Sequence, residues 1–252
     1  MSSAREIANL RSIPTNGNIL LDYTAGDALE SGGTCNIAAG LNALGAATTG
    51  DDNIALGRLA LGAGTLTGGV NIAIGATAGD AITSGACNIA IGLNALTAAT
   101  DNCDNIAIGQ SALAASVNDG DQNVAIGKTA MSAGDVSGFT NVAIGTDALK
   151  GITTGSRNVA IGDCALGGAT VTACHNVALG TYAADALTSG LNNVAIGQNA
   201  LGAATTSGYN VAIGYAALTA SVDDGENNVA IGRAPMSGAD VSGDSNVAIG
   251  YA

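Results

Sequence analysis

One five-residue motif recurs along almost the whole chain, and successive copies begin seventeen or eighteen positions apart, as at Asn36, Asn53 and Asn71. It reads Asn, Val or Ile, Ala, an aliphatic residue and Gly, and a more divergent copy, NILLD, begins at Asn18. Fixed periods of this length are typical of proteins built from stacked units, each of which packs on its neighbours. The sequence therefore predicts a repeat architecture over residues 18–252. The thirteen regular units open at Asn36, Asn53, Asn71, Asn88, Asn105, Asn123, Asn141, Asn158, Asn176, Asn193, Asn210, Asn228 and Asn246.

The lengths of the units repeat as well. Three long units and three short ones follow each other in a fixed order from Asn36 to Asn141, and the same order returns from Asn141 to Asn246. The segment NIAIGQSALAASVNDGDQ, which begins at Asn105, returns at Asn210 as NVAIGYAALTASVDDGEN. The loops between the motifs therefore belong to the repeat, and we expect them to follow one common path.

The alternation of side chains within the motif predicts a β-strand. When the Asn is counted as position 1, branched Val or Ile at positions 2 and 4 alternates with Ala at position 3, the period of two expected of a strand. We expect the branched side chains to be buried inside each unit and the Ala to face outward against a second packed surface. Gly at position 5 suits a corner that needs positive φ or a close approach of backbones. The predicted fold class is all-β, a parallel β-roll or β-solenoid of about fourteen coils, each seventeen or eighteen residues long.

The Ala-Leu pair at positions 8 and 9 predicts a second short strand, followed by a polar loop to the next coil. In the units of Asn18, Asn71 and Asn176 this pair comes three residues later, in TAGDAL, TAGDAI and YAADAL. We expect those coils to turn differently. A helical interpretation is disfavoured because Gly recurs every few residues and each costs about 1 kcal/mol in a helix interior.

Residues 1–17 lack the repeat and form a separate segment. SAREIANLRS reads as a helix, with Ser3 as its N-cap and Glu6 three residues later, as in a capping box. The predicted domain organisation is an N-terminal docking segment at 1–17 and a repeat β-roll shaft at 18–252. A disordered tail is the alternative interpretation of the first segment.

Composition argues against several classes of function. The net charge is −13 with only seven basic residues, whereas nucleic-acid binding needs clusters of Lys and Arg. An anionic membrane surface is disfavoured for the same reason. No stretch reaches the eighteen or so consecutive apolar residues of a membrane span, so we expect no membrane insertion, and the N-terminus has no apolar core of a secretory signal.

The Asn residues at position 1 are the candidate structural site. Stacking of identical units places each side-chain amide above the previous one, where amides hydrogen-bond along a ladder. Ligand binding by these Asn residues is the alternative. No cofactor is predicted.

Two equivalent loops carry weak candidates for a calcium site, because clustered carboxylates are ligands that Ca²⁺ prefers. Plain exposed turns are the alternative interpretation of these loops. The candidates are Asp119, Asp121, Asp223, Asp224 and Glu226.

No enzyme active site is predicted. The single histidine, His175, follows Cys174, but neighbours in a strand point to opposite faces, which is poor geometry for a Cys–His pair. The five cysteines form no CxxC and no zinc pattern, and we expect thiols. An ice-binding face would need Thr at one fixed position of every coil, whereas Thr is scattered through the loops in the sequence.

Oligomerisation is predicted from the thinness of the core. The chain has 2% aromatic residues and no Trp, so each coil is expected to bury little besides small aliphatic side chains. Packing demand on both faces of the strand then favours partner chains side by side. A homotrimer is the simplest such assembly.

The NVAIG…AL units resemble the head repeats of trimeric YadA-like adhesins over about residues 18–252. In that family, NSVAIG coils form a left-handed parallel β-roll and three rolls pack around a common axis. The loops are longer here, and the Ser after the Asn is missing. Similar repeats occur in bacteriophage tail fibres, and SAREIANL resembles the leader of marine phage fibre proteins.

The resemblance implies a structural virion appendage, a phage fibre or spike that acts as a particle-attached shaft in host attachment. Its partners would be two further copies, a virion head or tail protein bound through residues 1–17, and a host surface receptor bound through a distal region. The protein would be made in the host cytoplasm and located in the virion. A bacterial cell-surface trimeric adhesin head is the alternative. Because the unit of Asn246 stops before its Ala-Leu pair, we also expect the natural polypeptide to continue beyond Ala252.

Overall fold

The computed structural model describes residues 16–29, 32–116, 120–132, 134–168, 170–219, 225–238 and 243–251. The Cα atoms group into two compact units, Met1–Gln122 and Asn123–Ala252. The helix and most of the docking segment expected in residues 1–17 lie outside the described residues, which begin at residue 16. Every regular element in the described part of the chain is a β-strand. The described residues include no helix long and apolar enough to cross a lipid bilayer.

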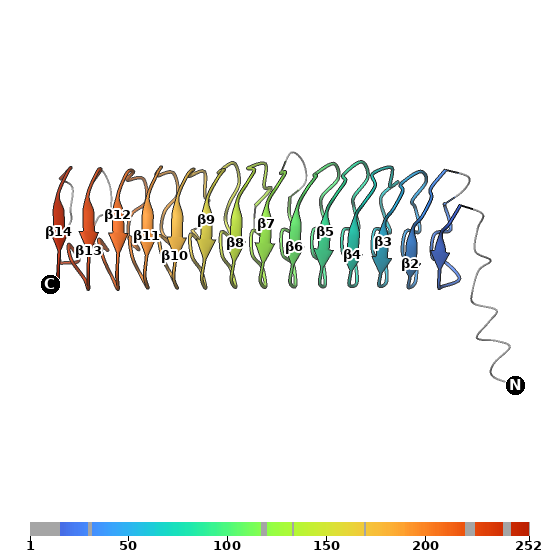
Figure 1. Cartoon of the computed structure of the whole chain (residues 1–252), viewed down its shortest axis with the longest axis horizontal. Coiled ribbons are helices and arrows are strands. Elements are labelled where there is room, and N and C mark those ends of the chain that lie inside the picture. The colour runs from blue at the N-terminus through green and yellow to red at the C-terminus, as the bar shows by residue number, and fades with distance from the viewer. Residues whose placement is uncertain are drawn as a thin grey trace, which may run out of the picture. The chain divides into compact units, whose positions relative to one another are not determined.

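The first unit contains six short parallel strands in sequence order (Figure 1). Each strand pairs with the next in register, so that motif lies on motif, as Ile54 lies opposite Ile72. Each strand residue therefore pairs with the same motif position of the next repeat, and one repeat is one turn of a solenoid. The strands are β1 (Ile19–Leu20), β2 (Ile37–Ala39), β3 (Ile54–Leu56), β4 (Ile72–Ile74), β5 (Ile89–Ile91) and β6 (Ile106–Ile108).

The second unit repeats this arrangement over eight strands (Figure 1). Val142, for example, lies opposite Val159 with the chains parallel. The predicted all-β parallel solenoid is therefore confirmed in each unit. The strands are β7 (Val124–Ile126), β8 (Val142–Ile144), β9 (Val159–Ile161), β10 (Val177–Leu179), β11 (Val194–Ile196), β12 (Val211–Ile213), β13 (Val229–Ile231) and β14 (Val247–Ile249).

The strand faces the opposite way from the sequence prediction. Ala at position 3 is inside the coil, as at the fully buried Ala55 and Ala143, whereas Val or Ile at positions 2 and 4 is half-buried or exposed. The expectation that the branched residues fill the roll was therefore wrong. In the regular coils a methyl group fills this place between the strand and the returning chain, whereas the divergent first coil buries Leu20 there.

The Ala-Leu pair lies in a turn, so the predicted second strand was also wrong. Leu59 and Leu61, at positions 7 and 9, have φ of 58° and 50°, in the left-handed region. Left-handed residues on both sides of Ala60 rotate the chain so that Ala60 and Leu61 are both fully buried. A strand would have directed these two neighbours to opposite faces.

Two of the three variant coils, those of β4 and β10, keep the same corner and fill it with a different residue. In the coil of β4, Gly79 occupies position 9 with φ of 59°, and the buried side chain comes from Ile82 three residues later. A Cβ on Gly79 would lie 3.1 Å from Ile82 Cδ1 and 2.9 Å from Leu61 Cδ2. In the coil of β10, Leu187 takes the same role. The expectation that these coils turn differently was therefore wrong for the backbone of these two corners, whereas the coil of Asn18 lacks the positive φ at positions 5 and 7 and does turn differently.

Candidate functional site

The Asn side chains at position 1 form a continuous hydrogen-bonded row inside each unit. Asn53 is representative: its backbone N–H and its Nδ2 both donate to Asn36 Oδ1, at 2.9 and 3.1 Å. In the first unit, the backbone N–H of each such Asn donates to Oδ1 of the Asn one coil earlier, from Asn18 through Asn105. It joins Asn123 through Asn246 in the second. Each bond runs from one coil to the coil before it.

The same amides also tie the strand to the returning loop of their own coil. Asn53 Nδ2 donates to the carbonyl of Gly68 at 3.2 Å, and Asn141 Nδ2 donates to Gly155 at 2.9 Å. Both Asn side chains are fully buried. An Asp in place of the Asn would lack the Nδ2 donor, and a Leu would lack both the donor and the Oδ1 acceptor. The geometry uses the amides inside the fold, with nothing directed toward a ligand.

The calcium candidates are only partly described. Asp119, Asp223 and Asp224 lie outside the described residues. Asp121 Oδ1 accepts a hydrogen bond from the Cys103 N–H at 2.7 Å, so its carboxylate caps the backbone of the preceding coil. Among the described residues, no three His, Cys, Asp or Glu side chains gather as ligands of a metal ion.

Glu226, the fifth candidate, lies two residues before its Asn, at the position that Asp121 occupies in an earlier coil. Its backbone N–H donates to Asp244 Oδ1 at 2.9 Å. Asp51 makes the same contact with the Thr34 N–H at 2.7 Å. Acidic residues two positions before the Asn therefore cap the previous coil, a role that sequence reasoning missed and that their shared position could have indicated.

Two of the thiols, those of Cys103 and Cys174, accept backbone hydrogen bonds from the preceding coil. Cys174 Sγ accepts the Ser156 N–H at 3.3 Å, and His175 is exposed. All five cysteines are thiols. Burial, followed by the nearby charge of Asp163, raises the pKa of the Cys164 thiol, which disfavours a reactive thiolate.

The repeat creates an outer aliphatic face along each unit. We use this name for the Val and Ile side chains at positions 2 and 4 of the motif, which form two rows along each unit. Ile74 is 37% exposed and Ile161 is 40% exposed. In each unit, successive strands therefore present a continuous apolar strip.

Two edge columns border this face. The position −1 column precedes the Asn, and the position 6 column follows the Gly. Their side chains are exposed, apart from the half-buried Ala76 and Thr181. Arg233 stacks between Tyr215 and Tyr251 in the position 6 column, with ring-centroid distances of 5.7 and 5.5 Å.

The position −1 column contains Gly17, Cys35, Asp52, Val70, Cys87, Asp104 and Gln122 in the first unit, and Thr140, Arg157, His175, Asn192, Tyr209, Asn227 and Ser245 in the second. The position 6 column contains Tyr23, Leu41, Arg58, Ala76, Leu93 and Gln110 in the first unit, and Lys128, Thr146, Asp163, Thr181, Gln198, Tyr215, Arg233 and Tyr251 in the second.

Hydroxyl side chains share one place in several coils, although Ser replaces Thr in some of them, so that no position carries Thr in every coil. They precede the residue whose carbonyl accepts the Asn amide, and they are exposed. Asp101 takes this place in the coil of β5. The sequence hid this column because the loops differ in length by one residue. Its members are Thr49, Thr67, Ser84, Ser137, Thr154, Thr172, Ser189 and Thr206.

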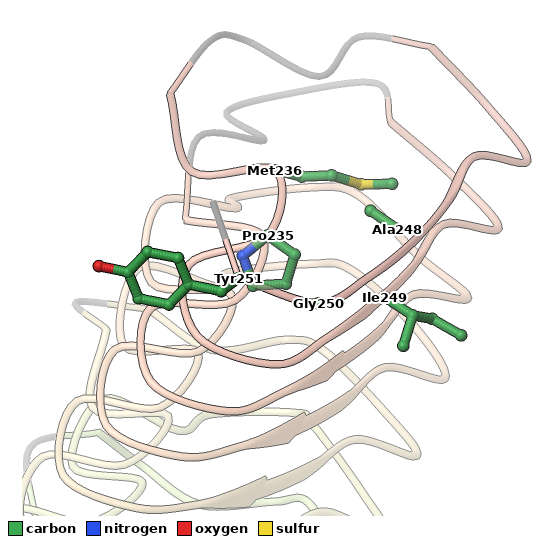
Figure 2. Close-up of a pocket in the computed structure, with 6 residues that line it drawn as sticks. All are labelled: Pro235, Met236, Ala248, Ile249, Gly250 and Tyr251. Carbon is green, nitrogen blue, oxygen red and sulfur yellow. The ribbon is translucent and has the colours of Figure 1, made fainter.

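A shallow apolar hollow lies beside β14 (Figure 2). Its volume is about 170 Å³, and its lining comes from Pro235, Met236 and the segment 248–251. Tyr251 and Ile249 lie on different sides of it in Figure 2. With one phenol as its only titratable group, the hollow has no acid–base pair for catalysis.

Comparison with protein-family models, with curated proteins and with solved structures gives no match for the chain. The function is therefore inferred from the geometry of the repeat and from the resemblance of its motif.

Proposed function

We propose that the chain is a structural shaft protein that assembles as a homotrimer and has no catalytic role. The observation that carries this proposal is the outer aliphatic face, a strip of half-exposed Val and Ile in each unit. Burial of apolar surface contributes about 25 cal/mol per Å², so a repeated strip of this kind favours association. Contiguous exposed apolar patches mark interaction surfaces in soluble proteins.

Other copies of the same chain are the partners that fit this strip best. A second copy presents an aliphatic row with the same spacing, because its coils have the same lengths. Rotational symmetry around the long direction of a unit lets every coil contribute to the contact. The resemblance to trimeric head repeats favours three copies.

The interior of the shaft supports a mechanical role. The Asn side chains use their amides to hold each coil on the previous one and to close the coil on itself. We propose that this shaft forms a fibre or spike of a virus particle and serves in host attachment. Residues 1–17 would attach it to a virion head or tail protein, and a distal region would bind the host receptor.

Sedimentation equilibrium tests the assembly. Three copies of the 24.0 kDa chain give a species of about 72 kDa. The pair Ile144→Ser and Ile161→Ser should dissociate the trimer, because both side chains lie on the outer aliphatic face. The matched pair Thr154→Ala and Thr172→Ala, in the exposed hydroxyl column, should leave it intact. A monomeric parent chain would contradict the proposal.

Localisation tests the virion role separately. Gold-labelled antibodies against the repeat should mark projections on purified virus particles, and deletion of residues 2–17 should abolish this labelling while trimers persist. Labelling confined to a bacterial envelope would overturn the virion role and favour the adhesin alternative.

A further inference from the structure

Two of the five cysteines lie in successive coils of the first unit, one residue apart in register. Cys87 belongs to the position −1 column of the coil of β5. Cys103 lies at position −2, two residues before the Asn, in the coil of β6. The Asp104 N–H donates to the Ala86 carbonyl at 3.1 Å. In a parallel pair this bond places Cys103 opposite Ala86, the residue that directly precedes Cys87.

The backbone at these two positions directs the side chains into one gap between coils. At position −1, a Cβ on Gly17 would lie 3.8 Å from the backbone nitrogen of Cys35 in the following coil. At position −2, a Cβ on Gly69 would lie 2.9 Å from the Asp51 carbonyl oxygen in the preceding coil. A side chain at position −1 therefore leans toward the following coil, and one at position −2 leans toward the preceding coil. The two thiols lean toward each other.

The contacts of Cys103 agree with this direction. Its Sγ accepts the Ala86 N–H at 3.4 Å, so the sulfur lies over the backbone that leads into Cys87. Coils about 4.8 Å apart and one step of about 3.8 Å along the chain put the two Cα atoms about 6 Å apart. Disulfides join Cα atoms about 4.4–6.8 Å apart. The bond is therefore within reach of side-chain rotation, without movement of a coil.

We propose that Cys87 and Cys103 are a redox pair, which a low-molecular-weight disulfide such as oxidised glutathione converts into a disulfide bond between successive coils. Cys87 is exposed and Cys103 is half-buried. The Cys87 thiolate attacks the oxidant, forms a mixed disulfide and releases one glutathione. The Cys103 thiolate then attacks Cys87 Sγ and releases the second glutathione. The cysteines lose two electrons and two protons, and the oxidant gains them as two thiols.

The other two thiols in the loops before the Asn lack a partner of this kind. Cys174 lies at position −2, and its sulfur also accepts a backbone N–H of the preceding coil. Position −1 of that preceding coil is Arg157. Cys35 lies at position −1, and position −2 of the following coil is Asp51. Each of these cysteines therefore reproduces one half of the pair, and the chain contains its own controls.

The bond would fasten the coils of β5 and β6 together beside the Asn row. Cross-links of this kind stabilise a protein mainly by restricting its unfolded chain. The inference does not depend on the proposed function. If the chain is a virion shaft made in the host cytoplasm, both thiols stay reduced during folding and the bond forms after release, because the cytosol keeps thiols reduced.

Peptide mapping without reduction tests the bond in the full chain after incubation with oxidised glutathione. A protease that cleaves before Asp separates the two cysteines at Asp101. The peptides of Cys87 and Cys103 should then remain joined, and the undigested chain should still run as a single subunit on a non-reducing denaturing gel. Cys87→Ser should abolish the linkage, and the matched Cys35→Ser should leave it intact. Oxidation should raise the melting temperature by a few degrees, and dithiothreitol should reverse the change.

Arg157→Cys builds the same arrangement in the second unit. Arg157 is exposed, and the new cysteine should link to Cys174, which has no such partner in the parent chain. If this engineered pair links and the native pair does not, the assignment of Cys87 and Cys103 is overturned. Failure of both pairs, or linkage of Cys87 only between chains, overturns it as well. Each of these results leaves the proposed trimer standing.

Discussion

At the scale of single residues, the Asn at position 1 explains why the motif tolerates so little variation there. In Asn141, for example, Oδ1 accepts two N–H groups from the next coil, and Nδ2 donates to the previous coil and to the returning loop. Buried amide groups are costly unless every donor and acceptor is used. The row of Asn side chains is therefore favourable only as a complete set.

Asn141→Ala is expected to destabilise the second unit by about 3 kcal/mol or more. It leaves the Asn158 N–H without its acceptor, while Asn158 Nδ2 loses one of two acceptors and keeps the Ala173 carbonyl. A buried donor without a partner costs about 1–3 kcal/mol. It also removes the donor to Gly155. Urea unfolding measures the effect, with the exposed Gln198→Ala as control. Equal midpoints for the two variants would contradict the role given to the Asn row.

Two half-buried carboxyls in the variant coils are expected to oppose folding at neutral pH. Burial is the main cause that raises the pKa of Asp80 and of Asp185. A folded-state pKa above the unfolded value of 3.8 means that stability falls as pH rises through this window. Asp80→Asn and Asp185→Asn should therefore raise the melting temperature at pH 7, and the gain should vanish below pH 3.8.

Asp147 has a lowered instead of a raised pKa, so its effect on the melting temperature should have the opposite sign. The Thr129 hydroxyl, and then Lys150, lower the pKa of the Asp147 carboxyl. This contribution to stability is present above pH 3.8 and is lost as the pH falls through the folded value. Asp147→Asn should slightly lower the melting temperature at pH 7. Equal shifts for all three Asn variants would show that burial does not set the pH dependence.

At the scale of the coil, the Gly at position 5 sets how closely successive corners can stack. Gly145 has φ of 136°, and a Cβ there would lie 2.4 Å from the Gly162 carbonyl oxygen. The next coil's backbone occupies the space that a side chain would need. The corner therefore depends on both the conformational freedom and the small size of glycine.

Gly145→Ala is expected to destabilise the second unit by more than about 3 kcal/mol, because strained φ alone costs about 1–3 kcal/mol and the clash adds to it. Gly250→Ala separates the two causes, since its φ is 137° but nothing lies within 4 Å of the added Cβ. Gly238→Ala, with open space and no positive φ, should be nearly neutral. Thermal unfolding of the three variants should follow the order Gly145, Gly250, Gly238, and a different order would contradict the stacking argument.

At the scale of the whole molecule, the period of the motif was enough to predict a parallel β-solenoid, because so short a repeat can close only one turn. The period could not decide which face of the strand turns inward. Ala and Ile alternate equally well in either direction, and the choice depends on how little room the coil encloses. The left-handed backbone conformation of Leu61 could not be predicted from the sequence either, because bulky residues rarely adopt positive φ.

The Asn row points one way along each unit, and this gives the growing shaft a direction of assembly. Every finished coil exposes an Oδ1 acceptor, and the coil that follows in the chain supplies the N–H groups that fill it. A ribosome delivers the coils in the same order, from the N-terminus onward. Each coil can thus template the next as it emerges, and the long polypeptide can be wound vectorially, one turn at a time.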